Sequence, residues 1–336
     1  MSTIKKILIK KNSSCKSIWF MRQAGRHLPE FKKIRSKNKN FIDLCLNSKL
    51  ASEITLQPII RYDLDSAIIF SDILLVPYAL GQEVKFIKNK GPILSEFNIE
   101  KFLALDKKTF LKKLNPVYKA IKITRSKLNK KKSLISFVGA PWTLIVYMLG
   151  IKIDKKKINI KKFFKNKINI DLILEKLIDY LCAHIEAQVK AGADIVQVFD
   201  SWAGLIPKSK INKLCYNPNL KIVNFCKSKK IPVICFPKGI KKKYLKFCNL
   251  VKPNGVNLDY DIDPNWAKRN LTKVVIQGGM NPRMLLKSDK QLFKEAKKYL
   301  DIFKNVPYIF NLGHGIIPGT KINKIEKLIN FIRKYK

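Results

Sequence analysis

The sequence predicts a single α/β domain built as a (β/α)8 barrel, the TIM-barrel class. Eight short runs rich in Val, Ile and Phe recur along the 336 residues, as expected for strands buried on both faces. Longer helical or polar segments separate these runs, which is the order of elements in such a barrel. No linker divides the chain, so residues 1–336 are expected to form one domain. A doubly wound open sheet is the alternative, and a smaller number of strands would have favoured it.

The predicted strands and helices alternate along the chain. The strands are expected at residues 17–21, 66–70, 134–138, 194–199, 232–236, 255–258, 273–277 and 307–311. The clearest helix is 171–190, whose apolar residues form one stripe that ends before Gly192. Further helices are expected at 41–62, 101–127, 208–227, 289–303 and 322–335. The stretch 151–169, rich in Lys, Asn and Ile, is expected to be a surface excursion.

The formal net charge of +44 suggests nucleic acid as a partner. The lysines that produce this charge are spread through nearly every polar segment, however, and many Asn and Ile accompany them. A codon bias towards A and T would give the same composition. We therefore expect no specific nucleic-acid partner, only weak and salt-sensitive binding. The positive charge would also attract an anionic substrate.

The cysteines indicate a reducing environment. There are seven of them, an odd number, and no two form a C-x-x-C pair. This pattern argues against a disulfide framework and a zinc ribbon, so free thiols and a cytoplasmic location are expected. No apolar run approaches the roughly 18 residues of a membrane span, and no signal peptide is recognisable. A membrane partner is not expected.

Polar or glycine-rich residues follow every predicted strand. They are Arg22 and Arg26, Ser71 and Asp72, 139–142 with Tyr147, 200–204, Lys238 and Gly239, Asp259, 278–282, and 313–315. In a (β/α)8 barrel the active site is built from the loops at the carboxyl ends of the strands. The sequence therefore predicts a site at this end of the barrel.

Arg22 and Arg26 lie on one short turn after the first predicted strand. Each guanidinium can donate paired hydrogen bonds to carboxylate or phosphate oxygens, so the turn suggests a polyanionic ligand. For an isolated R-x-x-x-R, a solvated surface loop is the more common explanation, and the decision depends on the rest of the chain.

Each of the other candidates has a structural explanation beside the functional one. Asp72 and Ser201 could cap helices, and Tyr147 could be a core aromatic. His314 lies between two glycines, which favours a ligand contact over a histidine held in the core. A carboxylate such as Asp72 among arginines would stay ionised and could stabilise developing positive charge.

Several common catalytic motifs are missing from the sequence. It contains no phosphate loop, dinucleotide-binding loop, zinc-protease motif or nucleophile elbow. No Cys and His pair has the spacing of metal ligands. Neither a cofactor nor a metal is therefore expected.

Five motifs are spread nearly from end to end of the chain. They are WFMRQAGR with LPE (19–26, 28–30), IFSDIL (69–74), GAPWTL with YM (139–144, 147–148), FDSWAG (199–204) and NLGHGI with PGT (311–316, 318–320). Together and in this order, they resemble the uroporphyrinogen decarboxylase family. The resemblance implies a barrel that needs no cofactor and forms homodimers. It also implies decarboxylation of the four acetate side chains of uroporphyrinogen III, which gives coproporphyrinogen III in porphyrin and haem biosynthesis.

The resemblance also implies roles for the residues that match. Substrate contacts would come from Arg22, Gln23, Ala24, Gly25, Arg26, Phe41, Asp72, Tyr147, Ser201 and His314. Asp72 would meet the pyrrole N–H groups and stabilise the cation formed when the ring is protonated. The turn of Arg22 and Arg26 would bind the substrate's carboxylates; an arginine would hold the departing carboxylate, and one could help to deliver the proton. Arginine is a poor acid at neutral pH, so the proton donor stays open, with a water beside Arg22 as one candidate.

The chain departs from the family's pattern at three places. His27 stands where tyrosine is usual, and Tyr78 stands where aspartate is usual. Residues 149–152 stand where the family has an acidic stretch that contains glycine and serine.

Two other functions remain open. One is a methyltransferase of the same superfamily, which generally carries a His/Cys zinc site; no cysteine follows His314 here. The other is a non-enzymatic nucleic-acid binder, which would gather its charge on one face.

Overall fold

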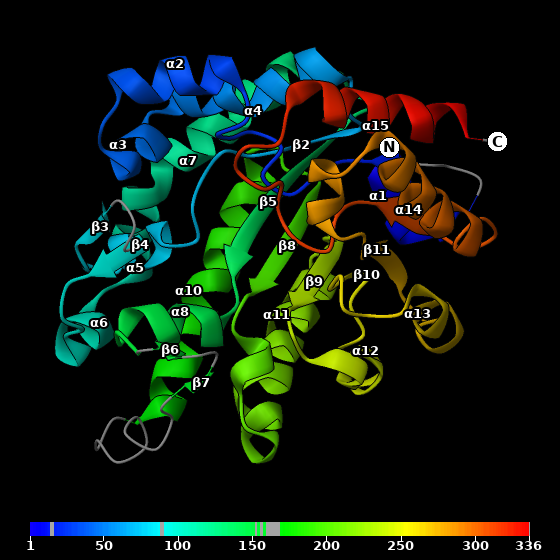
Figure 1. Ribbon diagram of the computed structural model, residues 1–336. Coiled ribbons are helices and arrows are strands. Elements are labelled where there is room, and N and C mark those ends of the chain that lie inside the picture. Colours follow the sequence, from blue (N-terminus) through cyan, green and yellow to red (C-terminus); the bar gives the residue numbers. More distant parts are fainter. Residues whose placement is uncertain (14–16, 88–90, 152, 155–156, 159–168, 336) are drawn as a thin grey trace.

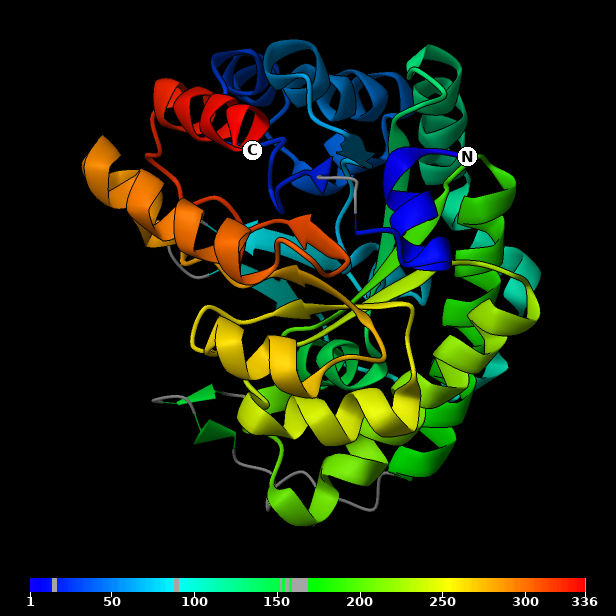
Figure 2. The same cartoon turned by 90° about the vertical axis from the view of Figure 1, so that its right-hand side faces the viewer.

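Eight parallel strands form a nearly closed barrel in the computed structural model, as predicted (Figures 1 and 2). The structure describes residues 1–13, 17–87, 91–151, 153–154, 157–158 and 169–335. Around the barrel the strands follow the order β1, β12, β11, β10, β9, β8, β5 and β2. Between β1 and β2, the Asp65 N–H donates to the Ile18 carbonyl at 3.1 Å, which joins the two edges.

The strands lie close to their predicted positions. They are β1 (Ser17–Ile18), β2 (Ser66–Ile68), β5 (Ser133–Gly139), β8 (Ile195–Asp200), β9 (Val233–Pro237), β10 (Gly255–Leu258), β11 (Val275–Gly278) and β12 (Tyr308–Phe310). The predictions 17–21 and 66–70 are too long. At the first, the Phe20 N–H donates to Gln23 Oε1 at 3.0 Å and the chain turns. At the second, the Phe70 N–H donates to Thr55 Oγ1 at 2.8 Å instead of to a strand.

Helices surround the barrel (Figure 2). The α-helices with described bounds are α1 (Thr3–Lys10), α2 (Pro29–Lys37), α3 (Phe41–Leu46), α4 (Ser48–Tyr62), α5 (Leu75–Ala79), α6 (Ile99–Ala104), α7 (Lys107–Lys127), α8 (Pro141–Met148), α10 (Ile170–Lys190), α11 (Asn217–Ser228), α12 (Tyr244–Val251), α13 (Pro264–Asn270), α14 (Asp289–Ile302) and α15 (Ile322–Lys334). The predicted helices 171–190, 289–303 and 322–335 agree with α10, α14 and α15 to within one residue at each end.

Three predicted helices are divided instead. Asn47 separates α3 from α4, because its side chain accepts the Leu50 N–H at 3.1 Å and starts a new helix. Asp106 separates α6 from α7 in the same way and accepts the Thr109 N–H at 2.9 Å. The region 208–227 contains a 3-10 turn (Lys208–Lys210) and a π-helical turn (Asn212–Tyr216) before α11 begins.

Some elements lie outside the sequence prediction. An antiparallel hairpin, β3 (Val84–Ile87) and β4 (Gly91–Leu94), follows α5. The predicted surface excursion 151–169 falls mostly outside the described residues. Within it, β6 (Ile153–Asp154) pairs antiparallel with β7 (Lys157–Ile158).

Inward-facing apolar side chains fill the barrel, and α1 covers its amino end. This interior cluster consists of Ile4, Ile7, Leu8, Trp19, Met21, Ile68, Ile135, Ile195, Ile234, Phe236, Val275 and Ile309. Ser133 Oγ, at the start of β5, donates to Ser2 Oγ at 2.8 Å, which holds α1 against the strand starts. A second and larger core lies between the strands and the helices.

A buried polar network crosses the middle of the barrel. The Trp19 indole N–H donates to Gln277 Oε1 at 3.0 Å. Gln277 Nε2 in turn donates to Gln197 Oε1 at 3.1 Å and to Asn257 Oδ1 at 2.9 Å. All four side chains are fully buried, so each needs such partners to offset the loss of water.

Candidate functional site

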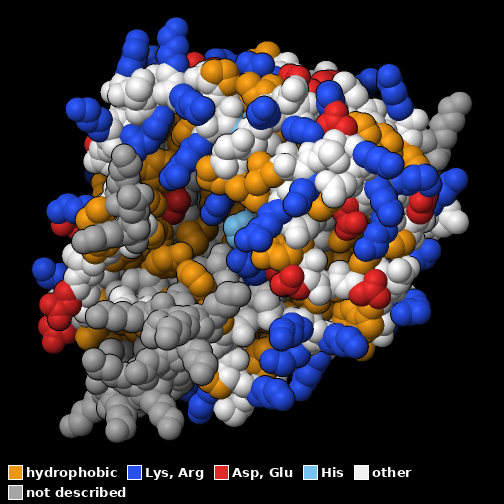
Figure 3. Space-filling model, viewed as in Figure 1, with side chains coloured by type: hydrophobic (Ala, Val, Ile, Leu, Met, Phe, Trp, Pro, Cys, Tyr) orange, Lys and Arg blue, Asp and Glu red, His pale blue; other side chains and the backbone are white. Residues whose placement is uncertain are grey.

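The carboxyl ends of the strands open onto a hollow in the surface. Figure 3 shows it with apolar surface and a histidine inside, and with Lys and Arg side chains around it. Phe199 and Phe236, whose ring centroids are 6.5 Å apart, and Phe137, 5.6 Å from Phe199, lie near the ends of β5, β8 and β9. On the face in Figure 3, basic side chains are also scattered around the periphery and do not form a single patch.

The turn after β1 is tied to strands on both sides. Gln23 Nε2 donates to the Ser66 carbonyl at 2.9 Å, at the start of β2. On the other side, the Met21 N–H donates to Asn311 Oδ1 at 3.1 Å, and the Met21 carbonyl accepts the Ile316 N–H at 2.9 Å. The Arg22 backbone is therefore held between β2 and the loop after β12.

Arg22 itself adopts the left-handed conformation, with φ of 61°, which is uncommon for a residue other than glycine. Its side chain lies against the backbone of Gly315, where an added Cβ would be only 2.4 Å from Arg22 Cδ. Arg26 is exposed four residues further on, with Ala24 and Gly25 half-buried between the two arginines. The turn thus presents Arg22 to the hollow in one defined position.

Asp72 follows β2 and is half-buried. Its Oδ1 accepts the Leu74 N–H at 2.9 Å, so the capping role that the sequence offered as an alternative is present. Burial raises the pKa of Asp72 to about 6, while the Leu74 N–H and the charge of Arg22 oppose this rise. The carboxylate is therefore mostly ionised at neutral pH, although burial outweighs the nearby arginine.

Tyr147 lies on α8 and faces Trp202, with ring centroids 6.2 Å apart. Burial raises the pKa of Tyr147, and a hydrogen bond with Trp202 opposes this rise. The negative charge of Asp72 adds to the rise, so the phenol lies within the electrostatic range of that carboxylate. Ser201 directly precedes Trp202 at the end of β8 and is half-buried. The Trp202 N–H donates to Thr143 Oγ1 at 3.3 Å, which connects this loop to α8.

Phe41 begins α3 beside the end of β2. Asn40 Oδ1 accepts the Ile42 N–H at 3.0 Å and so starts the helix at this ring. The ring packs edge-on against Phe70, at 5.8 Å between centroids, and against Phe86 of the hairpin, at 4.7 Å. Because Phe70 lies two residues before Asp72, Phe41 forms an apolar wall near the carboxylate.

His314 lies in the loop after β12. Its Nδ1 accepts the Gly315 N–H at 2.8 Å, so the neutral ring carries its proton on Nε2. Burial, together with the charges of Lys238 and Arg22, lowers the pKa of His314 to about 4. The ring is therefore neutral at pH 7 and offers one N–H donor, at Nε2.

The loops at the rim touch one another through glycines. A Cβ on Gly204, after β8, would lie 2.6 Å from the carbonyl carbon of Gly239, after β9. A Cβ on Gly313, after β12, would lie 2.4 Å from the backbone nitrogen of Tyr260, after β10. These positions need glycine because the neighbouring backbone occupies the space of a side chain.

Replacing Gly204 by Ala is expected to destabilise the fold. The new methyl group would overlap with the Gly239 backbone, which cannot rotate away as a side chain could, and overpacking of this kind costs about 1–3 kcal/mol. Urea unfolding of the variant and the parent protein measures the change. An unchanged free energy of unfolding would show that the two loops can separate without cost.

One residue that holds the site together, Asn311, begins the motif 311–316 but is not among the predicted site residues. Asn311 Oδ1 accepts both the Met21 N–H at 3.1 Å and the Leu312 N–H at 2.8 Å, and it is fully buried. It therefore connects the turn of Arg22 to the loop of His314. The signal available in the sequence was an Asn at the end of an otherwise apolar strand.

Two departures from the family's pattern lie beside the site. The His27 ring stacks on Tyr62 of α4, at 6.2 Å and 12° between planes. Burial lowers the pKa of His27 to about 4, so it is a neutral packing residue. Tyr78 is half-buried on α5. The third departure, 149–152, lies only partly within the described residues.

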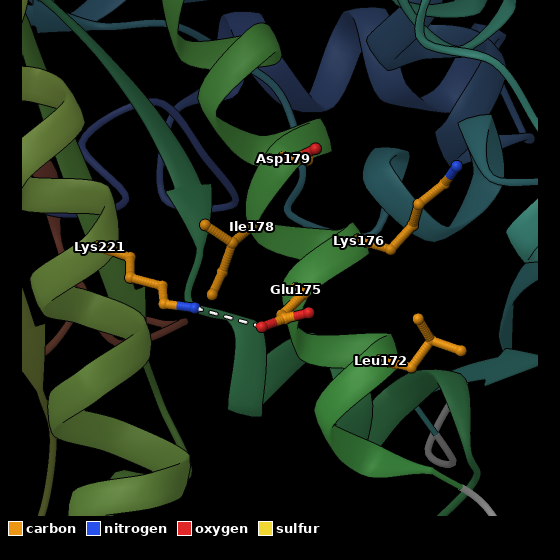
Figure 4. Close-up of a pocket in the computed structure, with 6 residues that line it drawn as sticks. All are labelled: Leu172, Glu175, Lys176, Ile178, Asp179 and Lys221. Carbon is orange, nitrogen blue, oxygen red and sulfur yellow. Dashed lines mark ion pairs between the residues drawn. The ribbon is translucent and has the colours of Figure 1, made fainter.

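A second depression lies on the outside of the barrel, between α10 and α11 (Figure 4). It has a volume of about 410 Å³ and is lined by Leu172, Glu175, Lys176, Ile178, Asp179 and Lys221. Glu175 and Lys221 form an ion pair across it at 3.7 Å. None of the predicted site residues lines it, so it is not the candidate site.

Within the described ranges, no cluster of three or more His, Cys, Asp or Glu side chains is arranged to hold a metal ion. Nor does any described helix combine the length and the apolar character that crossing a membrane requires.

Comparison with known proteins decides the family. The profile of the family described as Uroporphyrinogen decarboxylase (URO-D) matches residues 2–335. The chain belongs to this family. It is 41% identical to the uroporphyrinogen decarboxylase of Orientia tsutsugamushi (strain Ikeda) over 344 residues, which covers 100% of this chain and 99% of the relative. It is 42% identical to that of Rickettsia canadensis, with 98% of both chains covered.

A solved structure supports the fold of this uroporphyrinogen decarboxylase family member. A methyltransferase from Methanosarcina mazei superposes with a TM-score of 0.77 over 99% of both chains. The sequences are only 17% identical, so the likeness concerns the barrel and not the reaction.

Proposed function

We propose that this chain decarboxylates uroporphyrinogen III at its four acetate side chains and forms coproporphyrinogen III, in porphyrin and haem biosynthesis. Family membership along nearly the whole chain supports this reaction, which makes the protein a carboxy-lyase. The observation that carries the proposal is one half-buried carboxylate, Asp72, that feels the charge of Arg22 at the mouth of the barrel. An arginine suits the carboxylates of the substrate, and a lone carboxylate suits its pyrrole N–H groups.

Each decarboxylation exchanges a carboxylate for a proton. Protonation of a pyrrole carbon places positive charge on the ring. The bond between the acetate methylene and its carboxyl carbon then breaks, and carbon dioxide leaves while the electron pair moves into the ring. The methylene carbon takes up a proton and becomes a methyl group, and the ring loses the proton that it gained. The chain's task is to stabilise the charged ring and to orient the acetate.

We assign to Asp72 the role of stabilising the ring cation. Its carboxylate would accept hydrogen bonds from the pyrrole N–H groups and stabilise the positive charge as it forms. Arg22 and Arg26 would bind the acetate carboxylates, with Gln23, Ala24 and Gly25 shaping the turn between them. Tyr147, Ser201 and neutral His314 would donate hydrogen bonds to further oxygens, and Phe41 would pack against the macrocycle. Arg22, or a water that it holds, is our candidate for proton delivery.

The test is an anaerobic incubation of the purified protein with uroporphyrinogen III, followed by oxidation and separation of the products by carboxylate number. We expect species with seven, six, five and finally four carboxylates. A substrate that keeps all its carboxylates would refute the proposal. A heat-denatured sample serves as the control for spontaneous loss of carbon dioxide.

The rate should fall in acid as Asp72 is protonated. The pKa of Asp72 is raised to about 6, so its charge is present above that pH and lost below it. We expect kcat/KM to decline below about pH 6 as this free-enzyme group takes up a proton. A profile that stays flat down to pH 5 would show that the ionised carboxylate is not needed.

We also propose that residues 1–336 act as one barrel domain, in a cytoplasmic homodimer without a cofactor. The pairing of β1 with β12 supports one domain, because it joins the first and last strands of the barrel. Six of the seven cysteines lie in the described part, and they are free thiols, which suits a reducing compartment. Sedimentation equilibrium of the full chain tests the dimer.

A further inference from the structure

Lys238 lies at the mouth of the barrel, on the wall between Ser201 and His314. The residues of β9 that face into the barrel are Ile234 and Phe236, two positions apart. β9 ends at Pro237, and Lys238 is the first residue of the turn that follows, two positions after Phe236. The same two-residue step on β8 leads from Ile195 through Phe199 to Ser201.

The ladder between β8 and β9 ends one residue before Lys238. Asp200 pairs with Pro237 in register, and the Lys238 N–H donates to the Asp200 carbonyl at 3.1 Å. Ser201 and Lys238 therefore each follow directly on one of two paired strand ends, and the Lys238 N–H also donates to the Phe236 carbonyl at 3.0 Å as the chain turns.

The backbone of Lys238 is fixed on the other side as well. Its carbonyl accepts the Gly204 N–H at 2.8 Å. The next residue, Gly239, donates its N–H to Asp259 Oδ2 at 2.6 Å, and the Tyr244 hydroxyl donates to the same oxygen at 3.1 Å. Asp259 is buried at the end of β10, so its carboxylate serves to hold this loop.

The charge of Lys238 acts on groups on both sides of it. Burial is the main reason why the pKa of His314 is lowered, and the positive charge of Lys238 is the second. Burial raises the pKa of Asp259 to about 6, and the hydrogen bonds from Gly239 and Tyr244 oppose this rise, with Lys238 adding to their effect. Lys238 is half-buried, and its charge acts both on Asp259 at the end of β10 and on the His314 loop.

We propose that Lys238 is a further substrate-binding residue that pairs with a carboxylate of the anionic substrate, on the wall shared with Ser201 and His314. The inference rests on the proposed function, because it takes the substrate to be a macrocycle with carboxylates around its edge. Arg22 and Arg26 lie on one turn after β1 and cannot by themselves hold carboxylates around a whole ring. A half-buried lysine whose backbone is held at another strand end supplies a further anchor.

The test compares Lys238→Met, Lys238→Arg and Lys246→Met with the parent protein, each as the full chain and with uroporphyrinogen III under anaerobic conditions. Lys246 is exposed on α12, so its replacement removes the same charge away from the barrel mouth. Losing one charge-assisted contact should raise KM about tenfold in Lys238→Met and leave kcat within about twofold. Lys238→Arg should restore most of the affinity, and Lys246→Met should match the parent.

The alternatives give different results. An unchanged KM in Lys238→Met would overturn the inference. So would a fall in kcat and in melting temperature that arginine does not restore, because that pattern belongs to a residue that only supports Asp259 or the Gly204 contact. If Lys238→Met does not fold, Lys238→Gln takes its place, and the same split between KM and kcat decides. Failure of the proposed function is distinct, because the parent protein would then release no carbon dioxide.

Discussion

Asp72→Asn is expected to lower kcat for uroporphyrinogen III by about a thousandfold or more, since it removes the negative charge that would face the ring cation. The amide keeps an oxygen at the Oδ1 position and can still accept the Leu74 N–H at 2.9 Å, so the local fold should persist. The measurement is the anaerobic turnover rate, with circular dichroism to verify the fold. Asp43→Asn is the matched control, because Asp43 is exposed on the neighbouring helix α3.

The stability of the same variant separates a catalytic from a structural role. Because burial raises the pKa of Asp72 in the folded state, the ionised carboxylate costs stability above about pH 6. Removing that charge should leave the variant at least as stable as the parent at pH 8, and any advantage should shrink as the pH falls through 6. A variant that keeps near-full activity would remove Asp72 from the mechanism. One that unfolds at pH 8 would show that its main role is structural.

Arg22→Lys is expected to lower kcat/KM about a hundredfold, because a lysine keeps the charge but loses the paired donors of a guanidinium. The fixed position of residue 22 makes this loss of kcat/KM larger. Arg22 is held by its neighbours in the left-handed conformation and lies against Gly315, so a shorter ammonium cannot reach the same point. Arg283→Lys, at an exposed position on the rim segment Pro282–Leu286, is the control and should match the parent.

Gly315→Ala tests whether the position of the Arg22 side chain matters, without replacing the arginine itself. The added methyl group would lie 2.4 Å from Arg22 Cδ and force the side chain to move. We expect this variant to lose kcat/KM to a similar extent, and the double variant Arg22→Lys, Gly315→Ala to be little worse than either alone. Losses that multiply in the double variant would mean that Gly315 acts on something other than Arg22.

The chain's sequence by itself determined the barrel and most of the candidate site. Strands buried on both faces are continuous apolar runs, so β8, β9 and β10 could be located to within one residue. The loops after these strands carry short motifs whose residue types suit a polyanion. Local signals of this kind need no knowledge of distant contacts, and for that reason Arg22, Asp72 and His314 could be named in advance.

Only the tertiary structure decided how the site is held and charged. Two features depend on residues far apart in the sequence. One is the packing of α1 over the amino end of the barrel, and the other is the link that Asn311 makes between Met21 and Leu312. The pKa of about 6 at Asp72 is another such property. Burial and charge are set by whatever packs around a group, and in a barrel those neighbours come from opposite ends of the chain.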